Sequence, residues 1–195
     1  SDAADETEVT IKLPSSDILT PADSAVFLAW CHGLGTPTYG LPEKEMTFIW
    51  EDIAGTTVEV EAQWLTMSYA GTEETDWTGE AQVSTNETGF TVIAPETAPA
   101  AEGKFFLGWD VTIADKTYEK VQSGETVGDG FIYSGYTNKT MTFTARWQEI
   151  GKSNVTFDMN GGTYNGSTEN VIQTLTQPSA DVLTFIVTML AEPIR

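Results

Sequence analysis

The chain aligns with itself, and this internal repeat constrains the fold more than any other feature of the sequence. Its landmarks are aromatic segments that return in the same order with nearly the same spacing. They are Phe27-Leu28-Ala29-Trp30 with Phe106-Leu107-Gly108-Trp109, Tyr39 with Tyr118, Phe48-Ile49-Trp50 with Phe131-Ile132-Tyr133, and Glu61-Ala62-Gln63-Trp64 with Thr144-Ala145-Arg146-Trp147. A repeat of about 80 residues is too long for a helical solenoid and is typical of a string of small domains. Such domains usually bind, space or adhere, and rarely catalyse.

The repeat divides the 195 residues into two units and part of a third. We expect a first repeat unit at 1–64, a second repeat unit at 65–150, and a partial third unit of strands at 151–195. After each closing Trp an alternating strand begins, which ends at Gly71 or at Gly161. The first repeat unit has no good counterpart of this strand, so we expect it to be incomplete on its N-terminal side. The sequence is therefore interpreted as part of a longer array.

Alternation of apolar and polar residues predicts half-buried strands over residues 9–13 and, most clearly, over residues 58–64 and 141–147. Thr fills several of the alternate positions, which favours strands. The dipeptides that begin at Asn160 and Asn165 continue with Gly and predict turns with positive φ. Helical periodicity is weak throughout. The predicted fold class is therefore mostly β (α+β at the margin), with at most one short helix in each unit.

The chain is strongly acidic, with 29 Asp and Glu residues against 9 Lys and Arg residues and a formal net charge of −20. Phosphate backbones and anionic membrane surfaces repel such a chain, so we expect no nucleic-acid partner. No stretch approaches the roughly 20 apolar residues of a membrane span, so we expect no membrane insertion either. The acidity is explained by solubility or by the binding of a basic surface or of cations, and both explanations stay open.

Cysteine occurs once, at Cys31, so an intrachain disulfide is excluded. A disulfide-free, acidic, Thr- and Gly-rich string of domains suits the exterior of a Gram-positive-type bacterium, although it does not exclude the cytosol.

Three motifs resemble the Listeria–Bacteroides repeat, also called the internalin B-repeat family. They are Phe106-Leu107-Gly108-Trp109, Thr142-Phe143-Thr144-Ala145-Arg146-Trp147 and Val155-Thr156-Phe157-Asp158-Met159-Asn160-Gly161-Gly162. The resemblance implies tandem β-grasp-like (ubiquitin-like) modules of secreted proteins on the bacterial cell surface or cell wall, without catalytic residues or cofactors. The first repeat unit departs from the pattern, because Ala29 stands where the motif has Gly. The strand that begins at Leu65 also lacks the Asp-x-Asn-Gly-Gly motif.

The inventory of reactive residues offers little for catalysis. The only His, His32, adjoins Cys31, and adjacent side chains of a strand point to opposite faces, so the two form a poor nucleophile–base pair. The chain lacks the residues that a zinc site, a phosphate loop or a calcium loop requires. The carboxylates of Glu73 and Glu74 suit a solvated acidic turn better than a glycosidase cleft. We expect no enzyme, no cofactor and no metal site.

The tryptophans separate into two groups. Those that match an aromatic residue at the equivalent position are predicted to form the structural core of each unit: Trp30, Trp64, Trp109 and Trp147, and Trp50 with its counterpart Tyr133. Trp77 has no counterpart and lies in an acidic, Thr- and Gly-rich run. Its ring either binds a sugar or a protein partner, or folds back over its own sheet. Tyr136 and Tyr164 are weaker binding candidates of the same kind.

Two functions follow from these observations. In the first, the chain is an adhesion module that binds a host or matrix protein or a glycan. In the second, it is a passive spacer that holds a distant domain away from the cell wall. A binder is expected to expose an apolar patch near Trp77, whereas a spacer is expected to bury that residue. Self-association through the partial third unit is a further hypothesis.

Overall fold

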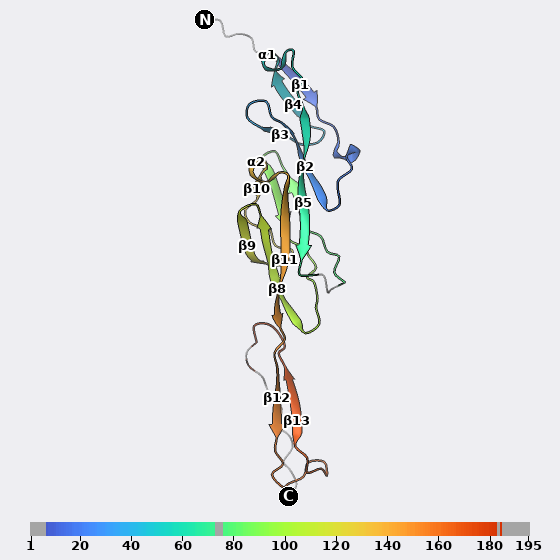
Figure 1. Cartoon of the computed structure of the whole chain (residues 1–195), viewed down its shortest axis with the longest axis vertical. Coiled ribbons are helices and arrows are strands. Elements are labelled where there is room, and N and C mark those ends of the chain that lie inside the picture. Colours follow the sequence, from blue (N-terminus) through green and yellow to red (C-terminus); the bar gives the residue numbers. More distant parts are fainter. Residues whose placement is uncertain (1–6, 73–75, 183, 185–195) are drawn as a thin grey trace. The chain divides into compact units, whose positions relative to one another are not determined.

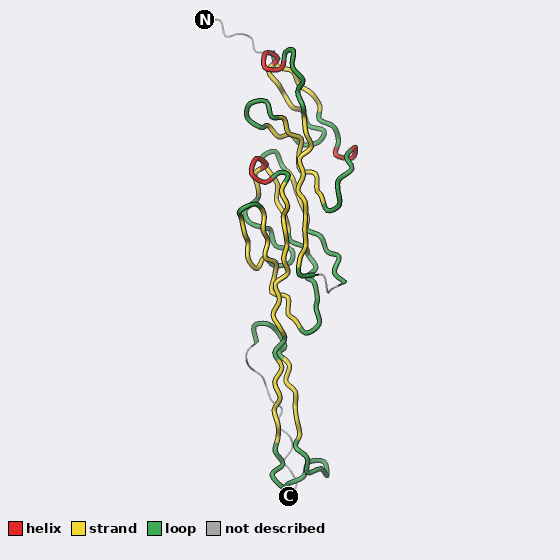
Figure 2. Tube along the Cα trace, in the orientation of Figure 1, coloured by secondary structure: helices red, strands yellow, loops and turns green. Residues whose placement is uncertain are grey.

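The computed structural model describes residues 7–72, 76–182 and 184, and it consists almost entirely of strands and loops (Figures 1 and 2). The elements are β1 (Glu8–Lys12), the 3₁₀ helix η1 (Ser16–Ile18), β2 (Ala25–His32), β3 (Thr38–Gly40), β4 (Glu45–Ile49), α1 (Trp50–Ile53), β5 (Val60–Ala70), β6 (Gln82–Thr85), β7 (Gly89–Ile93), β8 (Lys104–Ile113), β9 (Lys116–Val121), β10 (Phe131–Ile132), α2 (Tyr133–Tyr136), β11 (Lys139–Glu149), β12 (Lys152–Phe157) and β13 (Val171–Thr176). The mostly-β prediction is confirmed.

The helices are single turns. The equivalent residues Trp50 and Tyr133 each begin one of them, and each turn is closed by a backbone hydrogen bond to the carbonyl of that first residue. The first repeat unit also contains η1, so the expectation of at most one short helix per unit is wrong there. The Ser15 side chain explains this additional turn, because its hydroxyl accepts a hydrogen bond from the Asp17 amide at 3.3 Å.

The order of the elements recurs along the chain. The series β1, β2, β3, β4, α1, β5 returns as β7, β8, β9, β10, α2, β11. The antiparallel pairings recur as well, since β1 pairs with β4 as β7 does with β10, and β2 pairs with β3 as β8 does with β9. The prediction that each repeat unit has a β-grasp fold remains a prediction.

A six-stranded sheet joins the two series in the order β3-β2-β5-β11-β8-β9. Its central pair, β5 and β11, is parallel, with Leu65 opposite Lys139 and Ala70 opposite Thr144. The first half of β5 pairs antiparallel with β2 instead, from Val60 opposite His32 onward. One long strand therefore serves both series, as Figure 1 shows near the middle of the sheet.

The chain forms two compact bodies. The first body consists of Ser1–Pro99 together with Gly108–Arg146, and the second consists of Ala100–Leu107 together with Trp147–Arg195. This division differs from the predicted repeat units at 1–64, 65–150 and 151–195. The predicted boundary after Trp64 lies inside β5, which continues without interruption to Ala70. The repeat-unit boundaries remain predictions of the sequence.

The first body contains two sets of buried apolar side chains, one from each series. The first set is Leu13, Trp30, Met46 and Phe48, with Val58, Val60 and Ala62 packed against it. The second set includes Phe90, Val92, Trp109, Met141 and Phe143. Full burial of such a side chain contributes roughly 1.5–3 kcal/mol, so these positions hold the sheet together.

The second body contains the hairpin β12–β13, in which Val155 lies opposite Gln173. Asn160 and Asn165 have positive φ angles of 43° and 52°, which confirms the turns predicted at these Asn-Gly dipeptides. At the base of the hairpin, the buried amide of Gln177 accepts a hydrogen bond from the Gly151 backbone at 3.2 Å.

Candidate functional site

Trp77, the first binding candidate, packs over the sheet. Its ring centroid lies 5.2 Å from that of Tyr69 and 5.1 Å from that of Trp109. Its indole Nε1 donates a hydrogen bond to the Thr97 carbonyl at 2.7 Å, and an added Cβ at Gly79 would meet the ring at 2.5 Å. Trp77 is therefore half-buried in an aromatic cluster, as in the alternative that folds it back over its own sheet.

The two tyrosine candidates occupy different surroundings. Tyr136, in α2, is half-buried, and its ring meets that of Phe131 edge-on at 5.1 Å. Tyr164 is half-buried in the β12–β13 connection, where its backbone exchanges hydrogen bonds with Ser167. Trp77 belongs to a different aromatic cluster from Tyr136, so these two candidates do not form one binding surface.

The tryptophans predicted to be structural fall into two equivalent pairs. Trp30 and Trp109 are buried, and the Trp30 indole donates a hydrogen bond to the Pro14 carbonyl at 3.0 Å. Trp64 and Trp147 are half-buried instead. They meet the equivalent phenylalanines in the same way, since Phe27–Trp64 centroids lie 5.6 Å apart and Phe106–Trp147 centroids 5.7 Å apart, both edge-on.

Cys31 and His32 point to opposite faces of β2. The imidazole of His32 is buried against the Phe48 ring, and its Nδ1 accepts a hydrogen bond from the Leu34 amide at 3.4 Å. Burial raises the pKa of the Cys31 thiol, a hydrogen bond with Tyr39 partly opposes this, and the nearby carboxylate of Glu61 adds to it. A thiol with a raised pKa is a weak nucleophile at neutral pH.

The described residues offer no arrangement for a metal: none of their His, Cys, Asp and Glu side chains form a group of three or more that suits an ion. Glu73 and Glu74, the adjacent carboxylates singled out in the sequence, lie outside the described residues. None of the helices within 7–72, 76–182 and 184 has the length and apolarity to cross a membrane.

Equivalent positions of the two series differ in their exposure. Tyr133 is 3% exposed and Val92 is fully buried, whereas their counterparts Trp50 and Ile11 are 51% and 38% exposed. The prediction that Trp50 lies in a core is therefore wrong, because this residue begins α1, a turn without buried residues. Met141 and Phe143 are fully buried, but their counterparts in the first repeat unit, Val58 and Val60, are only half-buried. The first repeat unit therefore lacks material that the second repeat unit has.

That material is the covering segment, which we define as residues 65–72 and 76–86. Within it, Tyr69 stacks on Phe143 at 5.6 Å, Trp77 packs on Trp109, and the Asn86 carbonyl accepts a hydrogen bond from the Tyr133 hydroxyl at 2.6 Å. Its last strand, β6, pairs with β7. Among the described residues, the first repeat unit has no counterpart of this segment.

Within the described residues, the absence of such a segment leaves an open edge at Val60 and Glu61 of β5 and along the residues just before them. In the second repeat unit, Lys139–Thr144 of β11 pairs with Leu65–Ala70. The equivalent residues of the first repeat unit are 56–61, and in the described parts of the chain no strand pairs with Thr57–Glu59. This edge is not among the site residues predicted from the sequence, although the missing counterpart of the strand at 65–71 is a signal for it.

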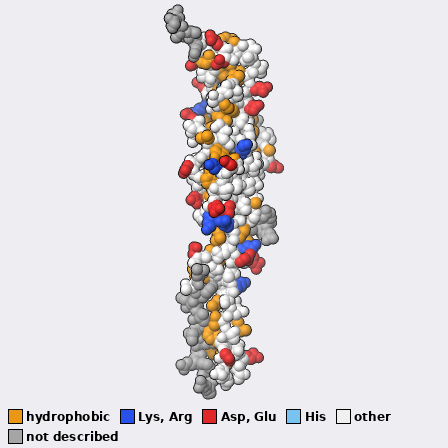
Figure 3. Space-filling view, turned by 60° about the vertical axis from the view of Figure 1, so that its left-hand side comes forward, with side chains coloured by type: hydrophobic (Ala, Val, Ile, Leu, Met, Phe, Trp, Pro, Cys, Tyr) orange, Lys and Arg blue, Asp and Glu red, His pale blue; other side chains and the backbone are white. Residues whose placement is uncertain are grey.

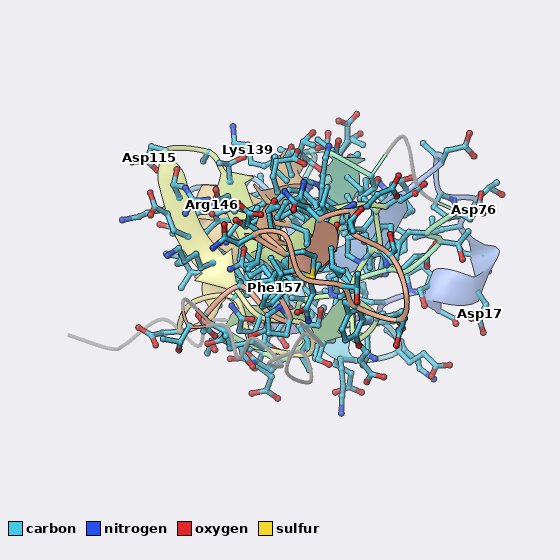
Figure 4. All side chains as sticks on the ribbon, turned by 90° about the horizontal axis from the view of Figure 1, so that it is seen from below. Asp17, Asp76, Asp115, Lys139, Arg146 and Phe157 are labelled. Atoms are coloured by element: carbon cyan, nitrogen blue, oxygen red, sulfur yellow. The ribbon has the colours of Figure 1, made fainter. Side chains whose placement is uncertain are left out.

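Charge is distributed unevenly along the chain. Residues 1–103 contain two basic and 19 acidic residues, a net charge of −17 out of the total of −20. Acidic side chains are dispersed over the face in Figure 3. Figure 4 places Lys139, Arg146 and Asp115 on one side and Asp17 and Asp76 on the opposite side. Arg146 forms an ion pair with Asp110, at 3.1 Å.

Comparisons of the chain with family models, curated proteins and solved structures found no match. The resemblance to the internalin B-repeat therefore rests on the sequence motifs alone.

Proposed function

We propose that this chain is a non-enzymatic module of a tandem-repeat protein on the exterior of a bacterium, at the cell surface or in the cell wall, and that it serves as a spacer. The recurring order of elements supports a repeat module, because a series of similar units can set a distance. The sequence motifs and the single cysteine support the extracellular location.

The packing of Trp77 is the observation that carries the spacer function. In the sequence, Trp77 is the strongest binding candidate, because no residue of the repeat is equivalent to it. In the folded chain its ring packs on Tyr69 and Trp109 and its indole donates to Thr97, so its contacts are with its own sheet. An aromatic side chain used in this way supports stability rather than ligand capture.

The geometry around Cys31 and His32 supports a non-enzymatic module. The imidazole of His32 packs on Phe48, and the Cys31 thiol is directed to the other face and donates weakly to the His32 carbonyl at 3.6 Å. A nucleophile and its base need side chains that converge on one point.

Adhesion is the second candidate, and the exposure of Trp50 favours it. This ring begins α1 and is 51% exposed, and the apolar side chain of Ile18 in η1 is 69% exposed. Exposed aromatic residues are common anchors in protein and glycan interfaces. A host or matrix protein or a glycan is the partner to which this candidate points.

A binding screen separates the two candidates. The intact chain is applied to arrays of glycans and extracellular-matrix proteins beside the variants Trp50→Ala and Trp77→Phe. The spacer function predicts no saturable binding tighter than about 100 μM, which corresponds to about −5.5 kcal/mol. A ligand that binds more tightly and is lost in Trp50→Ala but kept in Trp77→Phe would establish adhesion instead.

A further inference from the structure

The chain contains its own example of how the open edge of β5 is filled. In the second repeat unit, Leu65–Ala70 lies parallel to Lys139–Thr144, with Met67 opposite Met141 and Tyr69 opposite Phe143. This arrangement buries Met141 and Phe143 completely. An unpaired strand edge is a ready template for an added strand.

The first repeat unit presents the same edge without the added strand. By the alignment of Trp64 with Trp147, residues 56–61 correspond to 139–144. The strand β5 begins only at Val60, whereas β11 begins at Lys139, so the residues of 56–59 lie outside any described strand. A hollow of about 460 Å³ lies over one face of this stretch, lined by Tyr39 and Cys31 of the neighbouring strands and by the alternating residues Thr57, Glu59, Glu61 and Gln63.

We propose that residues 56–61 are an acceptor edge that binds an extended segment as a parallel strand. The segment has apolar residues at alternate positions and neutral or basic residues between them. Backbone hydrogen bonds supply the affinity and the alternate side chains supply the selectivity, as in other cases of β-augmentation.

The two faces of the edge define this chemistry. On one face the added strand lies beside Val58 and Val60, which pack on the core of the first repeat unit, so its side chains there are apolar. On the other face it lies beside Glu59 and Glu61, both exposed. Cross-strand neighbours of opposite charge attract and those of like charge repel, so the side chains on this face are neutral or basic.

This charge argument disfavours a second copy of the chain as the occupant. The strand of the chain that best resembles Leu65–Ala70 is β12, because Val155 and Phe157 alternate like Leu65 and Met67. In the register of β5 with β11, Asp158 would then lie beside Glu59. Two carboxylates at neighbouring positions repel each other, whereas Ser68 occupies the matching position in the covering segment.

The acceptor edge deepens the proposed function and rests on it, because a tandem module gains a continuous sheet when a neighbouring segment fills the edge. The acceptor edge and the spacer function can be contradicted by different experiments. A chain that binds no glycan or matrix protein remains a spacer even if the edge takes no strand.

The test uses the full chain labelled with ¹⁵N and a capped peptide that reproduces Leu65–Gly71. Titration is expected to shift the amide resonances of Thr57, Val58 and Glu59 and to slow their hydrogen exchange at least about tenfold. The same sequence joined ahead of residue 1 through a flexible linker raises the effective concentration into the millimolar range, which detects weak binding.

Three matched controls test the geometry and the charge. Two sets of peptides are N-methylated at alternate residues, so that each set blocks the backbone N–H groups on one edge of the added strand. Only the set that blocks the edge facing residues 56–61 is expected to abolish binding. A peptide carrying Ser68→Lys is expected to bind about fivefold more tightly than one carrying Ser68→Asp. The protein variant Glu59→Lys is expected to reverse that preference.

Several results would overturn the acceptor edge. One is unchanged Thr57–Glu59 amides with both the free and the joined peptide, and another is equal binding of the two N-methylated sets. Concentration-dependent shifts of the same amides without any peptide would show that a second copy fills the edge, against the charge argument.

Discussion

Trp77, which has no counterpart in the repeat, and Trp50, whose counterpart is Tyr133, have sharply different surroundings in the fold. Trp77 is held by Tyr69, Trp109 and Thr97, whereas Trp50 is 51% exposed at the start of α1. We therefore predict that Trp77→Ala lowers the free energy of unfolding by about 2–4 kcal/mol, and that Trp50→Ala lowers it by less than about 1 kcal/mol. Urea unfolding monitored by circular dichroism measures both. Equal costs would contradict the packing of Trp77.

Gly108 is a position where the backbone requires glycine. Its φ is +124°, and an added Cβ would come within 3.0 Å of the Lys120 carbonyl carbon, next to the bulge between β8 and β9. We predict that Gly108→Ala costs about 1–3 kcal/mol of stability. Gly135→Ala is the matched control, because a Cβ there meets nothing within 4 Å, and its midpoint in thermal unfolding is expected to stay unchanged or to rise. A harmless Gly108→Ala would show that this backbone relaxes freely.

Two tyrosines, the buried Tyr133 and the half-buried Tyr69, make stability depend on alkaline pH. Burial raises the pKa of Tyr69 and of Tyr133 above the ordinary value of 10.0, and the neighbouring carboxylate of Glu80 adds to the shift at Tyr69. A raised pKa in the folded state stabilises the fold below pH 10, and this contribution is lost as the pH rises through the folded values. Thermal unfolding is therefore expected to be insensitive to these groups at pH 8–9 and to weaken above about pH 10. Tyr133→Phe removes one of these titrations and is expected to flatten the decline, whereas a parallel decline would contradict the assignment.

At the scale of elements, Asn138 joins the two central strands. Its Nδ2 donates to the Gln63 Oε1 at 2.8 Å, and its Oδ1 accepts from the Trp64 amide at 3.0 Å. Its φ of 57° lies in the left-handed region, which Asn adopts more readily than other side chains. Both bonds cross from the start of β11 to the middle of β5 and so fix their parallel register.

Asn138→Ala is predicted to lower the free energy of unfolding by about 2–4 kcal/mol, because it removes both bonds and strains the backbone. Asn138→Gly keeps the left-handed backbone and loses only the amide, so it is expected to cost less. Urea unfolding separates the two contributions. A larger loss for Gly than for Ala would show that the amide does not act as described.

Some of these elements were predictable from the sequence. Period-two alternation predicted the strand regions at 9–13 and 58–64, and the Asn-Gly dipeptides predicted the turns at Asn160 and Asn165. The parallel pairing of β5 with β11 was not predictable, because it joins residues 74 positions apart and local pattern has no information on partners. The same limit applies to Trp77, whose partners Tyr69 and Trp109 lie on those distant strands.

The candidate site shows the same limit. The equivalence of the aromatic residues predicted that Trp30 and Trp109 lie in the core, and both are buried. Half-burial of Trp64 and Trp147 was not predictable, because it depends on which side chains from distant parts of the chain cover them. The acceptor edge at 56–61 was not predictable either, because it is recognised only by comparing the exposure of equivalent residues in the first and second repeat units.

At the scale of the whole molecule, one framework of strands is used twice, and among the described residues only its second use has a covering segment. The covering segment supplies Tyr69, Trp77 and Asn86 to the second repeat unit, while the first repeat unit keeps an exposed Trp50 and an open strand edge. The difference explains why residues at matching positions of the repeat have unequal exposure. It also makes the N-terminal portion the place where stability and binding respond to an added strand.

Native-state hydrogen exchange tests this difference most directly, because it compares equivalent amides within one molecule. The amides of Thr140, Met141 and Thr142 lie in a strand with neighbours on both sides, whereas those of Thr57–Glu59 lie beside no described strand. Thr140–Thr142 are predicted to exchange at least about a thousandfold more slowly than Thr57–Glu59, a difference of roughly 4 kcal/mol in local opening. Comparable protection of the two sets would contradict the account, because it would mean that the first repeat unit is already complete.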